Sequence, residues 1–343
     1  MHPYLPKAGI YTCRMLCTLI CRFLCSVIFW LQLKGYPLPY GALILPKPCR
    51  ENTSFLILHQ RVTNYYGLVT DLLQSTVDIT LNNGLGDVTE KNETIIKDTL
   101  GNGFSAVRHA NGRDWWVIVP EANSSCYYIT NINPELPIIT KECVDTVINI
   151  FGVNCLFTAD GNHFIHLTSR QLNTKVKCLK FDRSNGILSD CKTFTIRREV
   201  QWYGFAISPN SRYFYTSIGD SLLQYDLFST DIESSEVVVS KMNIAEYNGY
   251  GYLQLAPDGK IYVGAGTHVS TLHIINFPDN PGLSCNVEKS GINKFGTTAE
   301  MPFFPNFRLG AAVGINELNS NQNFEIKASP NPTSDVTVQG VDS

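Results

Sequence analysis

The sequence predicts an all-β fold made of a repeated hairpin unit, and three observations lead to this prediction. A short apolar run, a turn containing Asn or Asp, and an alternating apolar run follow one another four times. The turn residues are Asn111, Asp160, Asn210 and Asp258, so the interval between successive turns is nearly constant. Aromatic residues make up 11% of the chain, and aromatic side chains pack well on a pleated surface. Beyond residue 40 no long segment has the period of an amphipathic helix, so few helices are expected there.

The turn is the most specific element of each repeat. Asn-Gly and Asp-Gly supply the positive φ that a tight hairpin turn requires. Three of the four turn residues are followed directly by glycine, at Gly112, Gly161 and Gly259. The four turn residues and these glycines are therefore predicted to have a structural role.

Two further apolar runs follow each turn. The runs directly after the turns are Trp115–Val119, Phe164–Leu167, Tyr213–Tyr215 and Ile261–Val263. The next runs are Cys126–Thr130, Cys178–Asp182, Leu222–Asp226 and Leu272–Asn276, and Ser75–Ile79 is an earlier partial copy. A period of 40–50 residues that holds a hairpin and a further strand pair is typical of one four-stranded β-propeller blade.

The blade number follows from the length of the repeat region. Residues 41–318 are long enough for between five and six repeats at the spacing of the turns. We predict a propeller of six or seven blades that is incomplete in this chain, with unpaired strand edges near residues 41–70 or 290–315. An exposed edge is a template for association, so these edges would favour aggregation.

Residues 1–40 are predicted to form a separate apolar leader that does not pack into the propeller. Cys13, Cys17, Cys21 and Cys25 form a stripe at helical spacing inside this leader. Residues 15–33 are almost wholly apolar, but Arg22 makes a membrane span costly. The leader is either signal-like, with Phe23–Leu33 as the apolar core of a secretory signal, or an extension that is not native to the domain behind it.

Residues 319–343 are polar and too short to bury a core.

Composition excludes several classes of function. The 27 basic and 30 acidic residues give a net charge of −3, so nucleic-acid binding is not expected. The seven cysteines from Cys49 to Cys285 are scattered, and most are interpreted as small buried apolar residues. Cys-x-x-Cys does not occur, and no metal or cofactor is predicted.

Several longer motifs resemble a known family. They are Gly41–Ile44 with Pro46–Pro48, Asp78 with Asn82–Asn92, Ala106–Val117, Leu255–Tyr262, Met301–Pro302 with Phe304–Phe307, and Ala328–Ser334. The chain resembles secreted Bacteroidota proteins that pair a β-propeller with a type IX secretion sorting domain. Pro330, Asn331 and Pro332 look like the opening of the sorting signal. The resemblance implies export by the type IX secretion machinery to the cell surface or beyond. Family members carry further propeller sequence upstream and a longer sorting domain, so the resemblance also implies a chain shortened at both ends.

Candidate sites are few. His163 and His166 are three residues apart on a predicted strand, so they point to opposite faces and cannot chelate one metal. Asp182–Asp190 lacks the acidic spacing of a calcium loop, and His109 with Asp114 is interpreted as ordinary turn chemistry. The best binding candidates are exposed aromatic residues, which bring large contact area at low entropic cost. They are Trp202, Tyr203, Tyr247, Tyr250 and Tyr252.

The sequence thus favours a secreted or cell-surface binding or scaffold module without catalytic activity, with a protein or a glycan as its ligand. Membrane contact is expected only through residues 15–33, if these are retained. No Gly-x-Ser-x-Gly nucleophile motif occurs. The alternative is a propeller-fold enzyme that acts on glycans or peptides, with acidic residues converging on the central channel.

Overall fold

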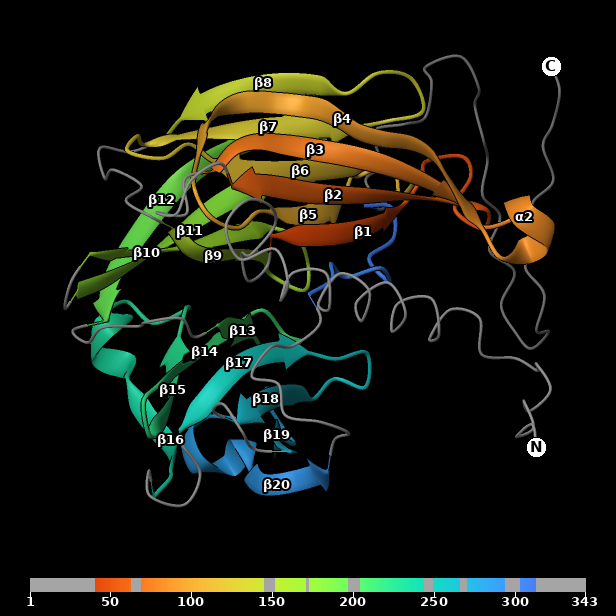
Figure 1. Cartoon of the computed structure of the whole chain (residues 1–343). Coiled ribbons are helices and arrows are strands. Elements are labelled where there is room, and N and C mark those ends of the chain that lie inside the picture. Colours follow the sequence, from red (N-terminus) through yellow and green to blue (C-terminus); the bar gives the residue numbers. More distant parts are fainter. Residues whose placement is uncertain are drawn as a thin grey trace, which may run out of the picture. The chain divides into compact units, whose positions relative to one another are not determined.

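The computed structural model describes residues 41–62, 69–144, 152–170, 173–196, 204–243, 249–265, 270–293 and 303–312. These residues form five four-stranded antiparallel sheets, called sheets 1 to 5 in chain order (Figure 1).

The strand bounds are as follows. Sheet 1 contains β1 (Ala42–Pro46), β2 (Ser54–Val62), β3 (Val69–Asp78) and β4 (Asp87–Leu100). Sheet 2 contains β5 (Ser105–Arg108), β6 (Trp115–Pro120), β7 (Cys126–Ile132) and β8 (Ile138–Cys143). Sheet 3 contains β9 (Gly152–Phe157), β10 (His163–Arg170), β11 (Asn173–Asp182) and β12 (Ile187–Ile196). Sheet 4 contains β13 (Phe205–Ile207), β14 (Tyr213–Ile218), β15 (Ser221–Asp226) and β16 (Val237–Lys241). Sheet 5 contains β17 (Tyr250–Leu255), β18 (Ile261–Ala265), β19 (Thr271–Ile275) and β20 (Val287–Asn293).

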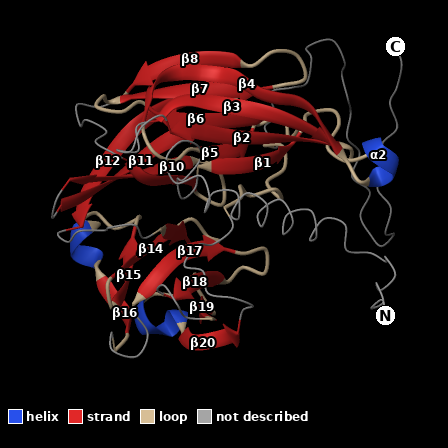
Figure 2. Ribbon diagram, viewed as in Figure 1, coloured by secondary structure: helices blue, strands red, loops and turns tan. Residues whose placement is uncertain are grey.

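The strand order within every sheet follows the chain, with the first strand at one edge and the fourth at the other. Five such sheets are consistent with the blades of a β-propeller, and the prediction of an all-β fold is confirmed. The helical elements in the described residues are the short turns α2 (Leu81–Gly84), η1 (Glu233–Ser235) and η2 (Gly282–Cys285) (Figure 2). The total of six or seven blades stays a prediction, and the predicted N-terminal helical segment lies outside the described residues.

The second strands of sheets 2 and 4 are buried on both faces, which explains their continuous apolar runs at Trp115–Val119 and Tyr213–Tyr215. Trp115 packs into a cluster shared by sheets 1 and 2, whereas its neighbour Trp116 packs into a cluster shared by sheets 2 and 3. Phe214 likewise packs towards sheet 3, and Tyr213 and Tyr215 pack towards sheet 5. Successive side chains of a strand point to opposite faces, so each sheet supplies one face to each neighbouring cluster.

Four hydrophobic clusters therefore join the five sheets in chain order. Leu45, Leu58 and Val117 belong to the cluster between sheets 1 and 2. The next clusters join sheets 2 and 3, sheets 3 and 4, and sheets 4 and 5. Each sheet is thus held mainly by burial of apolar surface against the sheets next to it in the chain.

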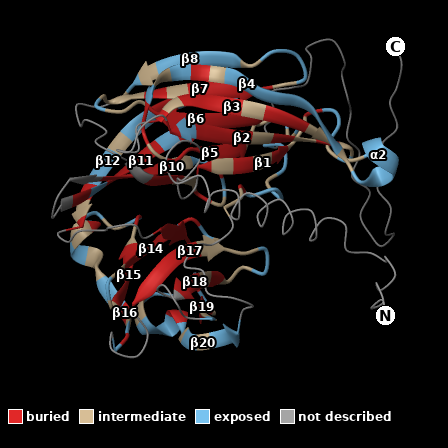
Figure 3. Ribbon diagram, in the orientation of Figure 1, coloured by how far each residue is buried: buried red, intermediate tan, exposed pale blue. Residues whose placement is uncertain are grey.

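The fourth strands are the most exposed (Figure 3). In β4 the first eight residues are exposed, and in β8 five of six are exposed. Within its sheet each of these strands pairs with the third strand only, and much of each strand contacts solvent. Their polar sequences follow from this position at the sheet edge.

The interpretation of the scattered cysteines is partly wrong. Cys155, Cys178 and Cys285 are buried thiols as expected, but Cys126 and Cys143 form a disulfide. These two residues lie directly opposite each other in the register of β7 and β8. The disulfide closes a hairpin, a pairing that depends on strand register and not on sequence spacing alone.

Helices long and apolar enough to cross a membrane do not occur in the described part of the chain. Residues 15–33, the predicted membrane-contacting segment, lie outside it.

Candidate functional site

The predicted turn residues lie where the first strand joins the second strand in sheets 2 to 5. In each turn a backbone N–H donates to the carbonyl three residues earlier. These bonds are Gly112 N to His109 O, Gly161 N to Thr158 O, Ser211 N to Ser208 O and Gly259 N to Ala256 O. The Asn or Asp side chain accepts a second bond from the N–H two residues later, at Arg113, Asn162, Arg212 and Lys260.

The residue after each turn Asn or Asp has a left-handed backbone. The φ values are 73° at Gly112, 74° at Gly161, 62° at Ser211 and 80° at Gly259. Glycine favours this conformation because it has no Cβ. In sheet 4 Ser211 takes the glycine's place, and its hydroxyl accepts a bond of 3.2 Å from the Asp160 N–H of the neighbouring sheet.

A segment near the C-terminal end of the described residues crosses these turns, and we call residues 303–311 the strap. The Asn306 side chain donates to Ala159 O at 2.8 Å, and the Arg308 guanidinium donates to Pro257 O at 2.6 Å. The Arg183 guanidinium donates to Gly310 O at 2.6 Å. The strap is thereby bonded to the turns of sheets 3 and 5.

Two turn glycines allow this close approach of the strap. A Cβ at Gly112 would lie 2.9 Å from Ala311 N, and a Cβ at Gly161 would lie 2.8 Å from Leu309 Cδ2. The strap also packs on sheet 2, where Phe307 meets Trp115 edge to face with 5.9 Å between ring centroids. The turn sequence thus serves both the hairpin and the docking of the strap.

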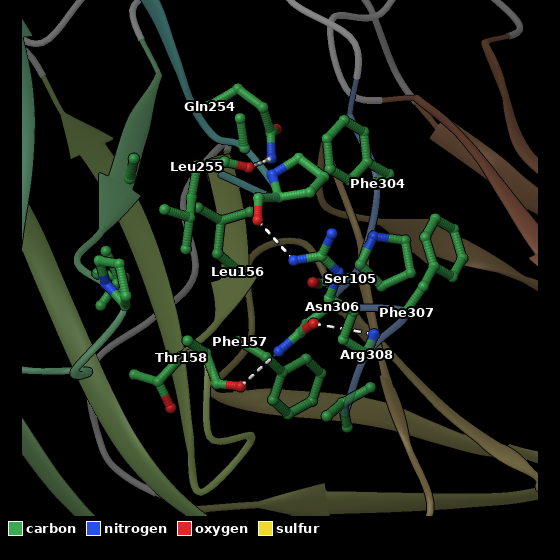
Figure 4. Close-up of a pocket in the computed structure, with 18 of the residues that line it drawn as sticks. Ser105, Leu156, Phe157, Thr158, Gln254, Leu255, Phe304, Asn306, Phe307 and Arg308 are labelled. Carbon is green, nitrogen blue, oxygen red and sulfur yellow. Dashed lines mark hydrogen bonds between the residues drawn. The ribbon is translucent and has the colours of Figure 1, made fainter. Parts of the chain in front are cut away.

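A cavity of about 450 Å³ lies between the strap and the first strands of sheets 2 to 5 (Figure 4). Its wall is mainly apolar and includes Leu156, Phe157, Ile207, Leu255 and Phe304. Each of the four repeats contributes part of its first strand, and sheets 3, 4 and 5 also contribute residues of the turn after it. The cavity is therefore assembled from equivalent segments of successive repeats, which are far apart in the sequence.

The polar lining of the cavity is sparse. Among the described residues it consists of Ser105, Thr158, Asp160, Gln254, Asn306 and Arg308. Pockets of this size with an apolar wall and a few polar groups are typical of sites for small molecules.

Asp160 is the only carboxylate in the described lining, and it accepts hydrogen bonds from residues of its own turn. One oxygen accepts from the Thr158 hydroxyl at 2.5 Å and from the Asn162 N–H at 3.1 Å, and the other accepts from the Asn162 side chain at 3.0 Å. Burial raises its pKa, but the hydrogen bonds from Thr158 and Asn162 outweigh burial and the pKa is lowered. Asp160 is therefore ionised at neutral pH and is poorly suited to donate a proton as a general acid.

Arg308 is the only cationic residue in the described lining. Its backbone N–H donates to Asn306 Oδ1 at 3.1 Å, and one guanidinium N–H donates to Pro257 O. Within the described residues no carboxylate forms an ion pair with it. The guanidinium, with five donors, keeps hydrogen-bonding capacity beside the cavity.

The prediction of exposed binding aromatics needs correction for two residues. Tyr250 is fully buried in the cluster between sheets 4 and 5, and its hydroxyl donates to Ser240 Oγ at 2.6 Å. Tyr252 is buried as well. Both lie on β17, which is covered on both faces. Trp202, Tyr203 and Tyr247 lie outside the described residues, as do Pro330, Asn331 and Pro332.

The histidines singled out from the sequence have separate environments. His166 is fully buried, and its Nδ1 lies 3.1 Å from the Tyr127 hydroxyl. His163 is half-buried on the same strand. His109 stacks on Trp116, with 5.2 Å between ring centroids. Across the described ranges no cluster of three or more His, Cys, Asp or Glu residues has the geometry of a metal site.

The carboxylates of the acidic turn residues accept hydrogen bonds from groups within their own turns. The Asp114 carboxylate accepts from the side chains of Asn111 and Arg113. Asp182 Oδ1 accepts from both the N–H and the hydroxyl of Ser184. These bonds are those of polar turns that follow strands.

Comparisons with known proteins give structural likenesses only. No family model and no curated protein matches the chain. A suggested 6-phosphogluconolactonase from Bacteroides uniformis has a TM-score of 0.47 and 13% identity, over 77% of this chain and 89% of that chain. A functionally unknown protein from Desulfotomaculum acetoxidans has a TM-score of 0.41 and 14% identity, over 76% of this chain and 75% of that chain. The Dos1 propeller has a TM-score of 0.42 and 10% identity, over 73% of this chain and 68% of that chain. These values carry no conclusion about activity.

Proposed function

We propose that the chain is a non-catalytic binding module of the β-propeller class, and that its ligand occupies the cavity beneath the strap. The observation that carries this proposal is the apolar cavity formed by four repeats, whose described lining holds one carboxylate, hydrogen-bonded within its own turn. Such a lining favours binding by burial of apolar surface. It offers no pair of titratable groups, among the described residues, for acid–base chemistry.

We further propose that the protein is secreted or displayed at the cell surface by type IX secretion. The disulfide between Cys126 and Cys143 supports export, because disulfides persist in oxidising compartments and are rare in the reducing cytosol. The Pro330–Pro332 motif and the resemblance given above support the type IX route.

A neutral apolar dye tests the binding site directly. N-Phenylnaphthylamine fluorescence is expected to rise when the dye enters the cavity of the wild-type protein. Ala256 lines the cavity and is half-buried, so Ala256→Trp is expected to fill part of the space. We expect dye affinity to fall by about tenfold or more, which corresponds to about 1.4 kcal/mol or more.

Ala122→Trp is the matched control, because Ala122 is also half-buried but lies between β6 and β7, outside the cavity lining. It should leave dye affinity unchanged. Equal binding by wild type and Ala256→Trp would refute the cavity as the binding site. Turnover of glycans or peptides that copurifies with the wild-type protein and is lost in Ala256→Trp would establish the enzyme alternative.

A further inference from the structure

We propose that the ligand of the cavity is a small organic carboxylate, with an apolar body against the inner strands and its anionic group on Arg308. This inference rests on the proposed function and specifies the chemistry of its ligand. It follows from three features of the described part of the site: the position of the Arg308 side chain, the charge balance of the lining, and the apolar wall with its limited volume.

The first feature is the position of the Arg308 side chain. It extends from the strap to the turn after β17, where it donates to Pro257 O (Figure 4). The Asn306 side chain links the backbone of Arg308 to the turn after β9, through its bonds with Arg308 N and Ala159 O. The guanidinium is thus held beside the cavity by two turns, which reduces the conformational entropy lost on binding an anion.

The second feature is the charge balance of the lining. Asp160 carries the opposing charge, but three hydrogen bonds from Thr158 and Asn162 surround its carboxylate. Two other exposed arginines on the turns are paired: Arg212 with Asp226 at 2.7 Å and Arg113 with Asp114 at 2.8 Å. Arg308 has no such ion pair among the described residues. The planar guanidinium group matches the geometry of a carboxylate or a phosphate group best.

The third feature distinguishes a carboxylate on an apolar body from a phosphorylated ligand. A phosphate group carries nearly two negative charges and is commonly held by several donors. The described lining provides one cation and a largely apolar wall, which fits a single negative charge. The volume of about 450 Å³ fits a small molecule and not a folded partner.

Displacement of N-phenylnaphthylamine by a matched pair of compounds tests this inference. Phenylbutyrate and phenylbutyramide have the same shape and differ in charge. We expect phenylbutyrate to compete about three- to tenfold more strongly with wild-type protein, a modest factor because Arg308 is exposed to solvent. Arg308→Gln should abolish this preference, measured as the ratio of acid to amide competition within the variant, and Arg308→Lys should keep part of it.

Arg212→Gln is the matched control, since it removes an exposed arginine outside the cavity lining. It should leave the preference for phenylbutyrate intact. Dye binding with equal competition by acid and amide would overturn the carboxylate inference and leave the proposed function standing. A preference that survives Arg308→Gln would overturn the role of Arg308. Stronger competition by a hexapeptide with a C-terminal phenylalanine than by phenylbutyrate would overturn the choice of a small ligand. Failure of the dye itself to bind would instead refute the proposed function.

Discussion

Reduction of the Cys126–Cys143 disulfide is expected to lower the free energy of unfolding by about 3 kcal/mol. The two residues are 17 positions apart in the sequence, and closing a loop of this size restricts the unfolded chain by about that amount in the loop-entropy model. Cys143 is exposed, so a reductant in solution can reach it. The loss is expected in denaturant unfolding with and without dithiothreitol.

The variant that replaces both Cys126 and Cys143 by serine should have the stability of the reduced wild type and no response to dithiothreitol. Cys49→Ser is the control, because Cys49 is an exposed free thiol. Unfolding midpoints of the wild type that do not change on reduction would show that this disulfide does not form or does not stabilise the fold.

Acidification from pH 8 to pH 5 is expected to reduce the free energy of unfolding by about 2 kcal/mol through His166 alone. Burial, together with the positive charge of Lys177, lowers the pKa of His166 from 6.5 to about 3. The unfolded chain binds this proton at pH 5 and the folded protein does not, so stability falls as the pH falls through this interval. The loss of stability should begin near pH 6.5, which is the pKa of histidine in the unfolded chain, and level off below about pH 3, the pKa of His166 in the folded protein.

His166→Leu removes this titration from a fully buried position. The variant loses the contact with Tyr127, so its stability at pH 8 will also differ, and the readout is the change between pH 8 and pH 5. Burial also lowers the pKa of His59, which leaves a residual acid sensitivity in the variant. An equal pH dependence of wild type and variant in urea unfolding would contradict the role given to His166.

The repeat, its turns and its first three strands could be predicted from the sequence because each has a local pattern. Asn111 and Asp258, for example, lie in turns with the same hydrogen bonds, as the repeated Asn-Gly and Asp-Gly motifs indicate. The fourth strands gave no such pattern. The segment that forms β4 is mostly exposed and rich in charged residues, so apolar alternation is lost.

The cavity and the strap could not be predicted because their contacts join distant segments. Arg183 and Gly310 are 127 residues apart, and Asn306 and Ala159 are 147 residues apart. The motif around Phe304 supported a family resemblance but did not indicate that it covers a cavity. The prediction that Tyr250 is an exposed binding residue was wrong, since this aromatic residue proved to be part of the core.

Photolabelling with a neutral aryl diazirine tests the central claim, that the cavity beneath the strap is the ligand site. After irradiation and digestion, mass spectrometry should find the label on peptides that carry Leu253–Pro257 and Phe304–Arg308, which line the cavity. Excess N-phenylnaphthylamine and the Ala256→Trp substitution should both suppress this labelling. Label that lies mainly on the exposed fourth strands, or that neither the competitor nor the substitution reduces, would contradict the claim.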